Sequence, residues 1–136
     1  MNILGLDIGD KRIGIAITTS GVIASELTVV ENNNQAIPFL IDLIKQKNIE
    51  KVVVGLPCLK SGDESLQAKK VKGFITEFLE KNPIPLFYED EILTSKEAER
   101  ILKEQGLGWE QAKLRIDQLS ARLILEQYLS HSKEEI

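Results

Sequence analysis

The sequence predicts an α/β fold in which a five-stranded mixed sheet lies between layers of helices, with the second strand antiparallel to the rest. The first observation is a hairpin at the start of the chain, where an apolar run over residues 3–6 and an alternating run over 13–18 flank a turn at 9–11. The second is the alternation of strand-like and helix-like segments after residue 31. Such alternation is typical of parallel strands joined by right-handed crossovers, so the sheet should contain both strand directions.

The remaining elements follow from apolar spacing and from the residues that interrupt it. A third strand is expected over residues 22–30, and the polar residues 31–34 then precede a helix with apolar positions 37, 40, 41 and 44. Residues 51–56 contain the β-branched run 52–54, which is apolar on both faces, as is typical of a central strand covered by helices on both sides. The later elements are a helix with an apolar stripe at 68–78, a strand at 86–88, a helix from the capping box at 94–97, and a last helix from about 109 or 113 to 129.

Length and composition favour one globular domain over residues 1–136. The hydrophobic fraction of 43% and the charged fraction of 28% are typical of such domains, and 136 residues suffice for one core but not for two. No apolar run approaches the roughly 20 residues that span a bilayer. The first residues also lack the basic and apolar regions of a signal peptide. A cytoplasmic protein without membrane contact is therefore expected.

The cysteine and histidine content restricts the kinds of site that the chain can build. A single cysteine, Cys58, excludes an internal disulfide framework and suits a reducing compartment. With a single histidine, His131 in a polar tail, a Cys/His metal site is also excluded. Any metal would therefore have oxygen ligands, which favours Mg²⁺ or Mn²⁺. The net charge of -4 gives no general attraction for nucleic acid, so local basic patches and metal ions would have to provide it.

Two acidic positions follow strands whose carboxyl ends should meet at one edge of the sheet, where open α/β sheets form their sites. Asp7 closes the apolar run of the first strand, and a charge there is costly unless it is paired or binds a metal. Asp90 and Glu91 follow the fifth strand. Two simpler interpretations remain open, namely Asp7 as a turn residue that bonds its own backbone and Glu91 as an ordinary loop acid.

Asp117 is a further acid in an unusual place. It shares a helix face with the apolar residues Ala121, Ile124 and Tyr128, and acids are rare on apolar stripes. The alternative is an acid in the first turn of the helix that complements the helix dipole. Together with Asp7 and Glu91 it would form a carboxylate cluster, which repels itself unless a divalent cation lies among its members.

Four segments that include these acids occur in order over nearly the whole chain. They read GLD-x-G-x-KRIG-x-A at 5–16, VGLP at 54–57 with Gly62 downstream, DE-x-LT at 90–94 and ID-x-x-SA at 116–121. With these segments the chain resembles the YqgF family, also called RuvX, of the ribonuclease H-like superfamily. The family pattern places an arginine directly after the Asp–Glu pair, whereas this chain has Ile92. The site would therefore lack one cation that could hold a phosphate or Glu91.

The resemblance implies a ribonuclease H-like three-layer fold and a metal-dependent nuclease of the bacterial cytoplasm, a hydrolase acting on ester bonds. It implies processing of the 5′ end of pre-16S ribosomal RNA in ribosome biogenesis or, by an earlier proposal for the family, Holliday junction resolution. By resemblance the catalytic acids and metal ligands are Asp7, Glu91 and Asp117. Two Mg²⁺ or Mn²⁺ ions, bridged by Asp7 and each held by one other acid, would suit phosphodiester hydrolysis. Candidate phosphate contacts, each equally well a solvated surface charge, are Lys11, Arg12, Lys69, Lys70, Lys113 and Arg115.

Three other functions compete with RNA cleavage. The metals would act on the phosphate, which RNA and DNA share, so the acids do not separate RNA from branched DNA. A sugar kinase or actin-like ATPase also has an Asp-x-Gly hairpin, but that fold needs two such domains and this chain has one. A non-catalytic nucleic-acid-binding or ribosome-assembly module is the remaining alternative. The expected partners are nucleic acid and precursor ribosomal particles, and the expected state is a monomer or weak homodimer.

Overall fold

The computed structural model of the chain describes residues 1–57, 65–90, 100, 103–104, 106 and 109–132, and side chains over the same ranges except at 109–114 and 132. The strands are β1 (Ile3–Ile8), β2 (Arg12–Thr18), β3 (Ser25–Glu31), β4 (Lys51–Leu56) and β5 (Leu86–Asp90). The helices are α1 (Ala36–Gln46), α2 (Leu66–Lys81) and α4 (Trp109–Ser132). Most of the helix predicted from residue 94, with its capping box, lies outside the described residues.

The strands form the predicted five-stranded mixed sheet, in the order β3-β2-β1-β4-β5. β1 pairs with β4 and β4 with β5 in parallel, whereas β2 is antiparallel to both of its neighbours, β1 and β3. The amide of Gly9 closes the hairpin between β1 and β2 by donating to the carbonyl of Arg12 at 2.9 Å. β1 therefore lies at the centre of the sheet, with a hairpin partner on one side and a parallel strand on the other.

The third strand begins at Ser25, later than the sequence predicted. Hydroxyl groups hold the preceding segment in a turn, since Oγ of Ser20 accepts from the amides of Val22 and Ile23 at 3.0 and 3.1 Å. Gly21 in this turn has a φ of 77°, a left-handed conformation that glycine adopts without strain. These local bonds keep residues 22–24 out of the ladder although their side chains are apolar.

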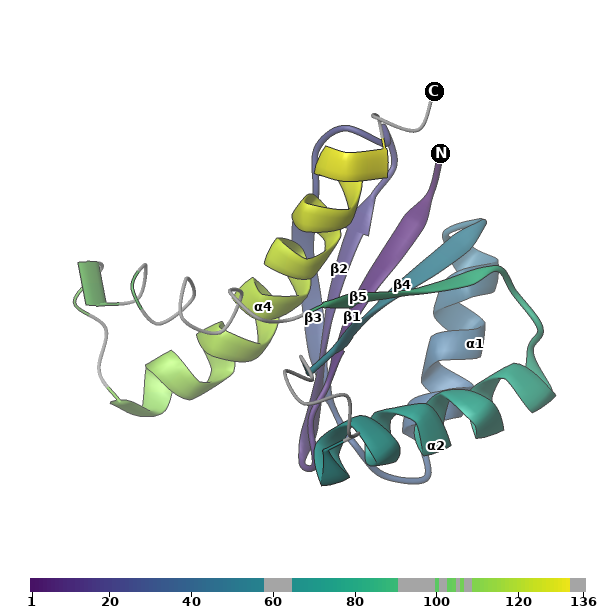
Figure 1. The fold of residues 1–136 in the computed structure, drawn as a ribbon, viewed down its shortest axis with the longest axis horizontal. Helices are drawn as coiled ribbons and strands as arrows, with labels where there is room; N and C mark the ends of the chain where they lie inside the picture. Colours follow the sequence, from purple (N-terminus) through teal and green to yellow (C-terminus); the bar gives the residue numbers. More distant parts are fainter. Residues whose placement is uncertain (58–64, 91–99, 101–102, 105, 107–108, 133–136) are drawn as a thin grey trace.

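Helices cover both faces of the sheet, with α1 and α2 on one side and α4 on the other (Figure 1). Because successive strand residues point to opposite faces, Leu4 and Leu6 of β1 belong to the core under α1 and α2, whereas Ile3 packs with α4. β4 contributes buried valines to both cores, as its doubly apolar run predicted. None of the helices in the described part of the chain is long and apolar enough to cross a membrane.

α4 approaches the sheet more closely than side chains would allow at two glycines. A Cβ built on Gly14 of β2 would overlap the backbone carbonyl of Asp117. One built on Gly5 of β1 would lie 2.9 Å from Cβ of Leu125 and 3.0 Å from the backbone oxygen of Ala121, closer than such contacts normally allow. The helix backbone therefore rests directly on β1 and β2, and this contact fixes which helix residues face the end of β1.

Candidate active site between β1 and α4

Asp7 lies in the ladder of β1 and not in the turn that follows. It pairs in register with Gly14 of β2, and its side chain is half-buried. Strand alternation places it on the same face as Gly5, which is the face that α4 covers. The side chain of Asp7 therefore projects from the sheet toward the helix layer, which favours a role in a site over the role of a turn residue.

Asp117 reaches the same place from α4. The helix begins at Trp109, so Asp117 lies beyond the first turn and the interpretation as a first-turn acid is wrong. The backbone carbonyl of Asp117 lies against Gly14, which is the register partner of Asp7. The fold thus brings two acids that are far apart in the sequence to one small area of the sheet. The predicted apolar face of this helix is confirmed by the burial of Ala121, Ile124 and Tyr128.

Arg12 supplies a cation to the same area. Nε of Arg12 donates to Oδ2 of Asp117 at 2.6 Å, and the two side chains are 33% and 21% exposed. Arg12 is the first residue of β2 and lies two residues before Gly14, so both are on the face that α4 covers. Asp117 is therefore held to β2 twice, through its backbone at Gly14 and through its carboxylate at Arg12.

The third predicted ligand, Glu91, lies outside the described residues, as does Ile92. β5 ends at Asp90, which pairs with Leu56 at the end of β4, so Glu91 follows directly after the strand from which it was predicted to project. Within the described residues, no three Asp, Glu, His or Cys side chains are grouped so that they could hold a metal ion. Asp7 and Asp117 bring two carboxylates to this area of the sheet, and such hard oxygen donors fit Mg²⁺ or Mn²⁺.

Several predicted phosphate contacts lie around the hairpin turn, because the start of α2 is fastened there. The side-chain amide of Gln67 on α2 donates to the carbonyl of Ile8 at 3.2 Å. One turn of helix further, Nζ of Lys70 lies 3.4 Å from Oδ1 of Asp10 in the turn. Both elements contribute exposed cations to this end of the sheet. They are Lys11, Lys69 and Lys70.

Arg115 has a partner within the fold. Its Nη1 lies 2.6 Å from Oε2 of Glu26 on β3, and Arg122 lies 3.6 Å from the other oxygen of that carboxylate. Glu26 thereby fastens α4 to β3, and a phosphate would have to compete with it for Arg115. The side chain of Lys113, the remaining predicted contact, lies outside the described part of the chain.

Comparison with known sequences gives the family. Residues 1–131 match the family described as RuvX: Holliday junction resolvase. The chain belongs to the RuvX family. A relative from Desulforudis audaxviator (strain MP104C), named "Putative pre-16S rRNA nuclease", is 38% identical over 136 residues, which cover 98% of this chain and 96% of the relative. A protein of the same name from Crocosphaera subtropica (strain ATCC 51142 / BH68) is 39% identical over 133 residues, with coverage of 96% and 93%.

Solved structures agree with the fold. The RuvC of T. thermophilus in complex with a Holliday junction substrate superimposes with a TM-score of 0.63 at 13% identity, covering 98% of this chain and 96% of that one. The Fowlpox virus resolvase in complex with its substrate Holliday junction DNA gives a TM-score of 0.57 at 13% identity, with coverage of 97% and 99%. The RuvX chain therefore has the ribonuclease H-like fold. Membership of the family makes it a nuclease, a hydrolase acting on phosphodiester bonds.

Neutralising Lys69 and Lys70 together, as Lys69→Gln and Lys70→Gln, is expected to weaken nucleic-acid binding by the RuvX chain and to flatten its salt dependence. Each lost phosphate contact lowers the slope of log affinity against log salt concentration by about 0.7 to 0.9. Turnover at saturating substrate should change little, because the predicted metal ligands stay intact. Fluorescence anisotropy at several salt concentrations measures the slope.

The matched control removes two charges at the opposite end of the sheet. Lys45 and Lys47 are exposed at the end of α1, where the side-chain amide of Asn2 donates to the carbonyl of Lys47 at 3.0 Å, beside the start of β1. Changing both to Gln removes the same number of positive charges but should leave the salt slope intact. An unchanged slope in the Lys69 and Lys70 variant would show that the start of α2 does not contact nucleic acid.

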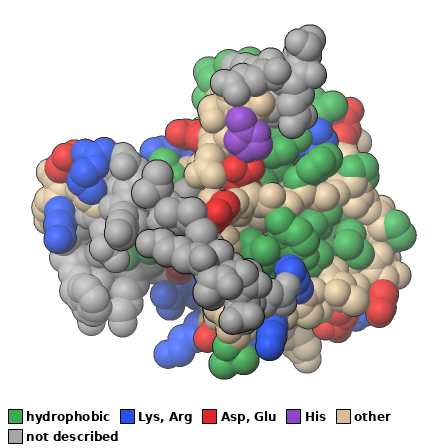
Figure 2. All heavy atoms as spheres, in the orientation of Figure 1, with side chains coloured by type: hydrophobic (Ala, Val, Ile, Leu, Met, Phe, Trp, Pro, Cys, Tyr) green, Lys and Arg blue, Asp and Glu red, His purple; other side chains and the backbone are tan. Residues whose placement is uncertain are grey.

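A buried acid absent from the predicted site fastens α4 to β5. Glu89 is 7% exposed. Its carboxylate lies 2.8 Å from Nε2 of His131 and 2.7 Å from Nε2 of Gln127, which also donates to the carbonyl of Asp90 at 2.9 Å. Figure 2 shows the histidine beside acidic side chains on this face. The prediction of His131 in a polar tail was wrong, and its spacing of one helical turn from Gln127 is the signal that could have revealed their common face.

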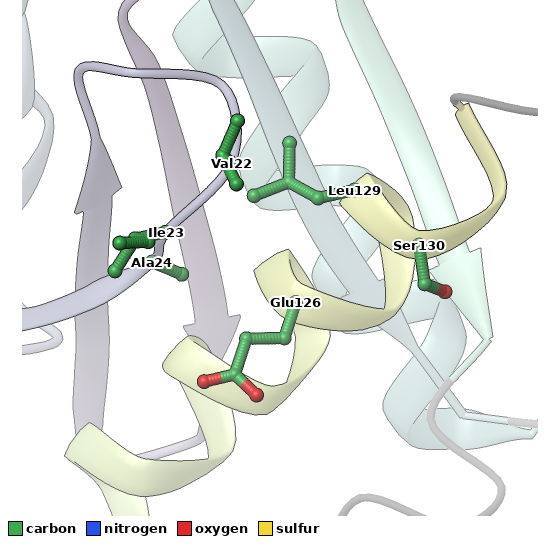
Figure 3. A pocket seen from close by; sticks show the side chains of 6 residues that line it. All are labelled: Val22, Ile23, Ala24, Glu126, Leu129 and Ser130. Carbon is green, nitrogen blue, oxygen red and sulfur yellow. The ribbon is translucent and has the colours of Figure 1, made fainter.

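A shallow, mostly apolar groove of about 370 Å³ lies at the C-terminal end of α4. It runs between the turn before β3 and the last turns of the helix, where the side chains of Val22 and Leu129 point toward each other and Glu126 lies at one side (Figure 3). The groove has one carboxylate and no cation among its lining residues. Its chemistry therefore does not suit a phosphodiester, in contrast to the area around Asp7.

Proposed function

We propose that this RuvX chain processes the 5′ end of pre-16S ribosomal RNA, in the bacterial cytoplasm and on precursor ribosomal particles. The name of its relatives supports the substrate. The observation that carries the site is the direct contact of the Asp117 backbone with Gly14, the register partner of Asp7. The proposed catalytic acids and metal ligands are Asp7, Glu91 and Asp117, all within one domain of residues 1–136.

The proposed chemistry needs two Mg²⁺ or Mn²⁺ ions, since paired dications activate a water and stabilise the leaving oxygen of a phosphodiester. Asp7 on the central strand, together with Glu91 and Asp117, would hold these ions. Cations at the turn between β1 and β2, at the start of α2 and in α4 bind flanking phosphates, which positions the nucleic-acid strand without reading its sequence. The proposed phosphate contacts are Lys11, Arg12, Lys69, Lys70, Lys113 and Arg115.

The test incubates the purified protein with precursor ribosomal particles that carry 5′-extended 16S RNA, in Mn²⁺, in Mg²⁺ and in EDTA. The expected product is a shortened 5′ end with either metal and none in EDTA, and Asp117→Asn should give none in any buffer. Depletion of the protein in cells should let the 5′-extended precursor accumulate. Particles left uncut by the unmodified protein with both metals would contradict the proposal and favour a non-catalytic assembly module.

Cleavage of branched DNA is a second candidate, favoured by the family description and by the fold shared with RuvC. Resolution of a four-way junction requires two cuts, so two copies of the site must act on one junction. A monomer or weak homodimer, the state expected for this chain, suits single cuts in RNA better. Sedimentation with a four-way DNA junction, combined with mapping of the cuts, separates the candidates. A stable dimer that makes both cuts in one binding event would favour the junction.

A further inference from the structure

The ion pair between Arg12 and Asp117 places a cation on a carboxylate that the proposed function needs for metal. Nε of Arg12 donates directly to Oδ2 of Asp117 at 2.6 Å, so the arginine contacts an oxygen that could itself be a ligand. The two side chains are 33% and 21% exposed, so solvent reaches both. The pair is therefore accessible to an incoming ion and is not sealed in a core.

Asp117 cannot favourably bind Arg12 and a dication at the same time, because both are positively charged. A dication on the carboxylate of Asp117 would lie within a few ångströms of the guanidinium, and like charges at such distances repel strongly when they are partly shielded from water. A partly exposed ion pair, by contrast, contributes little free energy. A dication should therefore displace the arginine. A displaced Arg12 remains on the same face of the sheet, because it is the first residue of β2 and its backbone carbonyl is bonded to the amide of Gly9.

We infer that Arg12 is an exchangeable counter-ion, which neutralises Asp117 before metal binds and moves to a substrate phosphate afterwards. The inference rests on the proposed function and adds a coupling to it, because metal binding would release the cation that substrate binding requires. By reciprocity, substrate would then strengthen metal binding. Arg12 would thus serve in succession as the partner of the carboxylate and as a phosphate contact.

A contrasting role predicts the opposite result. If Arg12 stays on Asp117 and orients it as a ligand, its removal should weaken metal binding, by about 10- to 100-fold for such outer contacts. If Arg12 competes with metal, its removal should strengthen metal binding. The sign of one measurement therefore separates the two roles.

The test is the dissociation constant for Mn²⁺, measured by electron paramagnetic resonance on the full chain without nucleic acid. Arg12→Gln is expected to bind Mn²⁺ several-fold more tightly than the unmodified protein, and to bind labelled RNA more weakly. Lys45→Gln is the control, since it removes the same charge from an exposed residue at the opposite end of the sheet, away from the proposed phosphate contacts, and should leave the affinities for Mn²⁺ and RNA nearly unchanged. Equal or weaker Mn²⁺ binding by Arg12→Gln would overturn the inference. Mn²⁺ binding that Asp7→Asn and Asp117→Asn leave unchanged would overturn the proposed site instead.

A second measurement needs no change at Arg12. In the unmodified protein, the Nε–H proton of Arg12 should exchange slowly with water because it is bonded to Asp117, and its nuclear magnetic resonance signal should disappear in Asp117→Ala, which has no acceptor. Diamagnetic Mg²⁺ at saturation should accelerate this exchange in the unmodified protein. A signal that stays protected in saturating Mg²⁺ would show that the ion pair persists with metal and would overturn the inference.

Discussion

Asp7→Asn is expected to cleave no detectable RNA or DNA, while its thermal stability in metal-free buffer equals or exceeds that of the parent. Asp7 lies on the face of the central strand that α4 covers, where Asp117 also lies, so the change removes one of two neighbouring negative charges and the repulsion between them. The carboxylate that carries this charge is the proposed ligand of the two dications. Its loss should abolish metal binding and cleavage together, and added Mn²⁺ should stabilise the variant less than the parent.

Thermal melts in EDTA and in Mn²⁺, run beside a cleavage assay, check both parts of this prediction. Asp10→Asn is the matched control, because Asp10 is an exposed acid of the hairpin turn paired with Lys70 at 3.4 Å. It should retain cleavage and the stabilisation by Mn²⁺. If Asp7 is instead a structural residue, Asn should keep most of its hydrogen bonds, change stability by about 1 kcal/mol and cleave at close to the parental rate, which would contradict the proposed site.

Among Gly→Ala substitutions at the glycines described here, Gly14→Ala is expected to cause the largest loss of stability and activity. Its Cβ would overlap the backbone carbonyl of Asp117, and a helix backbone cannot rotate away as a side chain can. α4 must therefore shift from β2, at a cost of about 1–3 kcal/mol, or roughly 3–10 °C in Tm for a chain of this size. The shift also moves Asp117 relative to Asp7, and a misplacement of about 1 Å can lower the rate by about 100-fold.

Gly73→Ala is the control for this substitution. Gly73 lies within α2, and a Cβ built on it meets nothing within 4 Å. Alanine there should stabilise the helix by about 0.5–1 kcal/mol and leave cleavage intact. Circular dichroism melts and single-turnover rates of both variants provide the comparison. Parental stability and parental rate in Gly14→Ala would show that α4 does not rest on β2 as described.

The sheet was predictable because its signals are local. Alternation identified the hairpin, the doubly apolar run identified β4, and the order of elements gave the direction of each strand, all of which the structure confirms. The start of β3 was wrong because hydroxyl groups of Thr18 and Ser20 bond the amides of the turn, and such bonds outweigh the apolar side chains of residues 22–24. Apolar spacing carries no information about that competition.

The acids of the candidate site could be predicted from the sequence, but the contacts that position them could not. Asp117 could be singled out from its apolar helix face, but its approach to Asp7 depends on Gly14, and a glycine in a strand has several explanations. Pairing partners are also long-range, so the bonds of Arg12 to Asp117 and of Arg115 to Glu26 appear only in the folded chain. Glu91 remains a prediction, because it lies outside the described residues.

The anchoring of α4 at several points along its length restricts how this chain can change in evolution. The helix touches Gly14 at Asp117, Gly5 near Leu125 and Glu89 at Gln127. Insertion of one residue between the first two of these contacts would rotate the part of the helix on one side of the insertion by about 100° about the helix axis relative to the other part. It would also lengthen the helix by about 1.5 Å. Asp117 would then leave the sheet, or the later contacts would be lost. Relatives that share this packing should therefore keep the number of residues between these positions constant, even where the residues themselves differ.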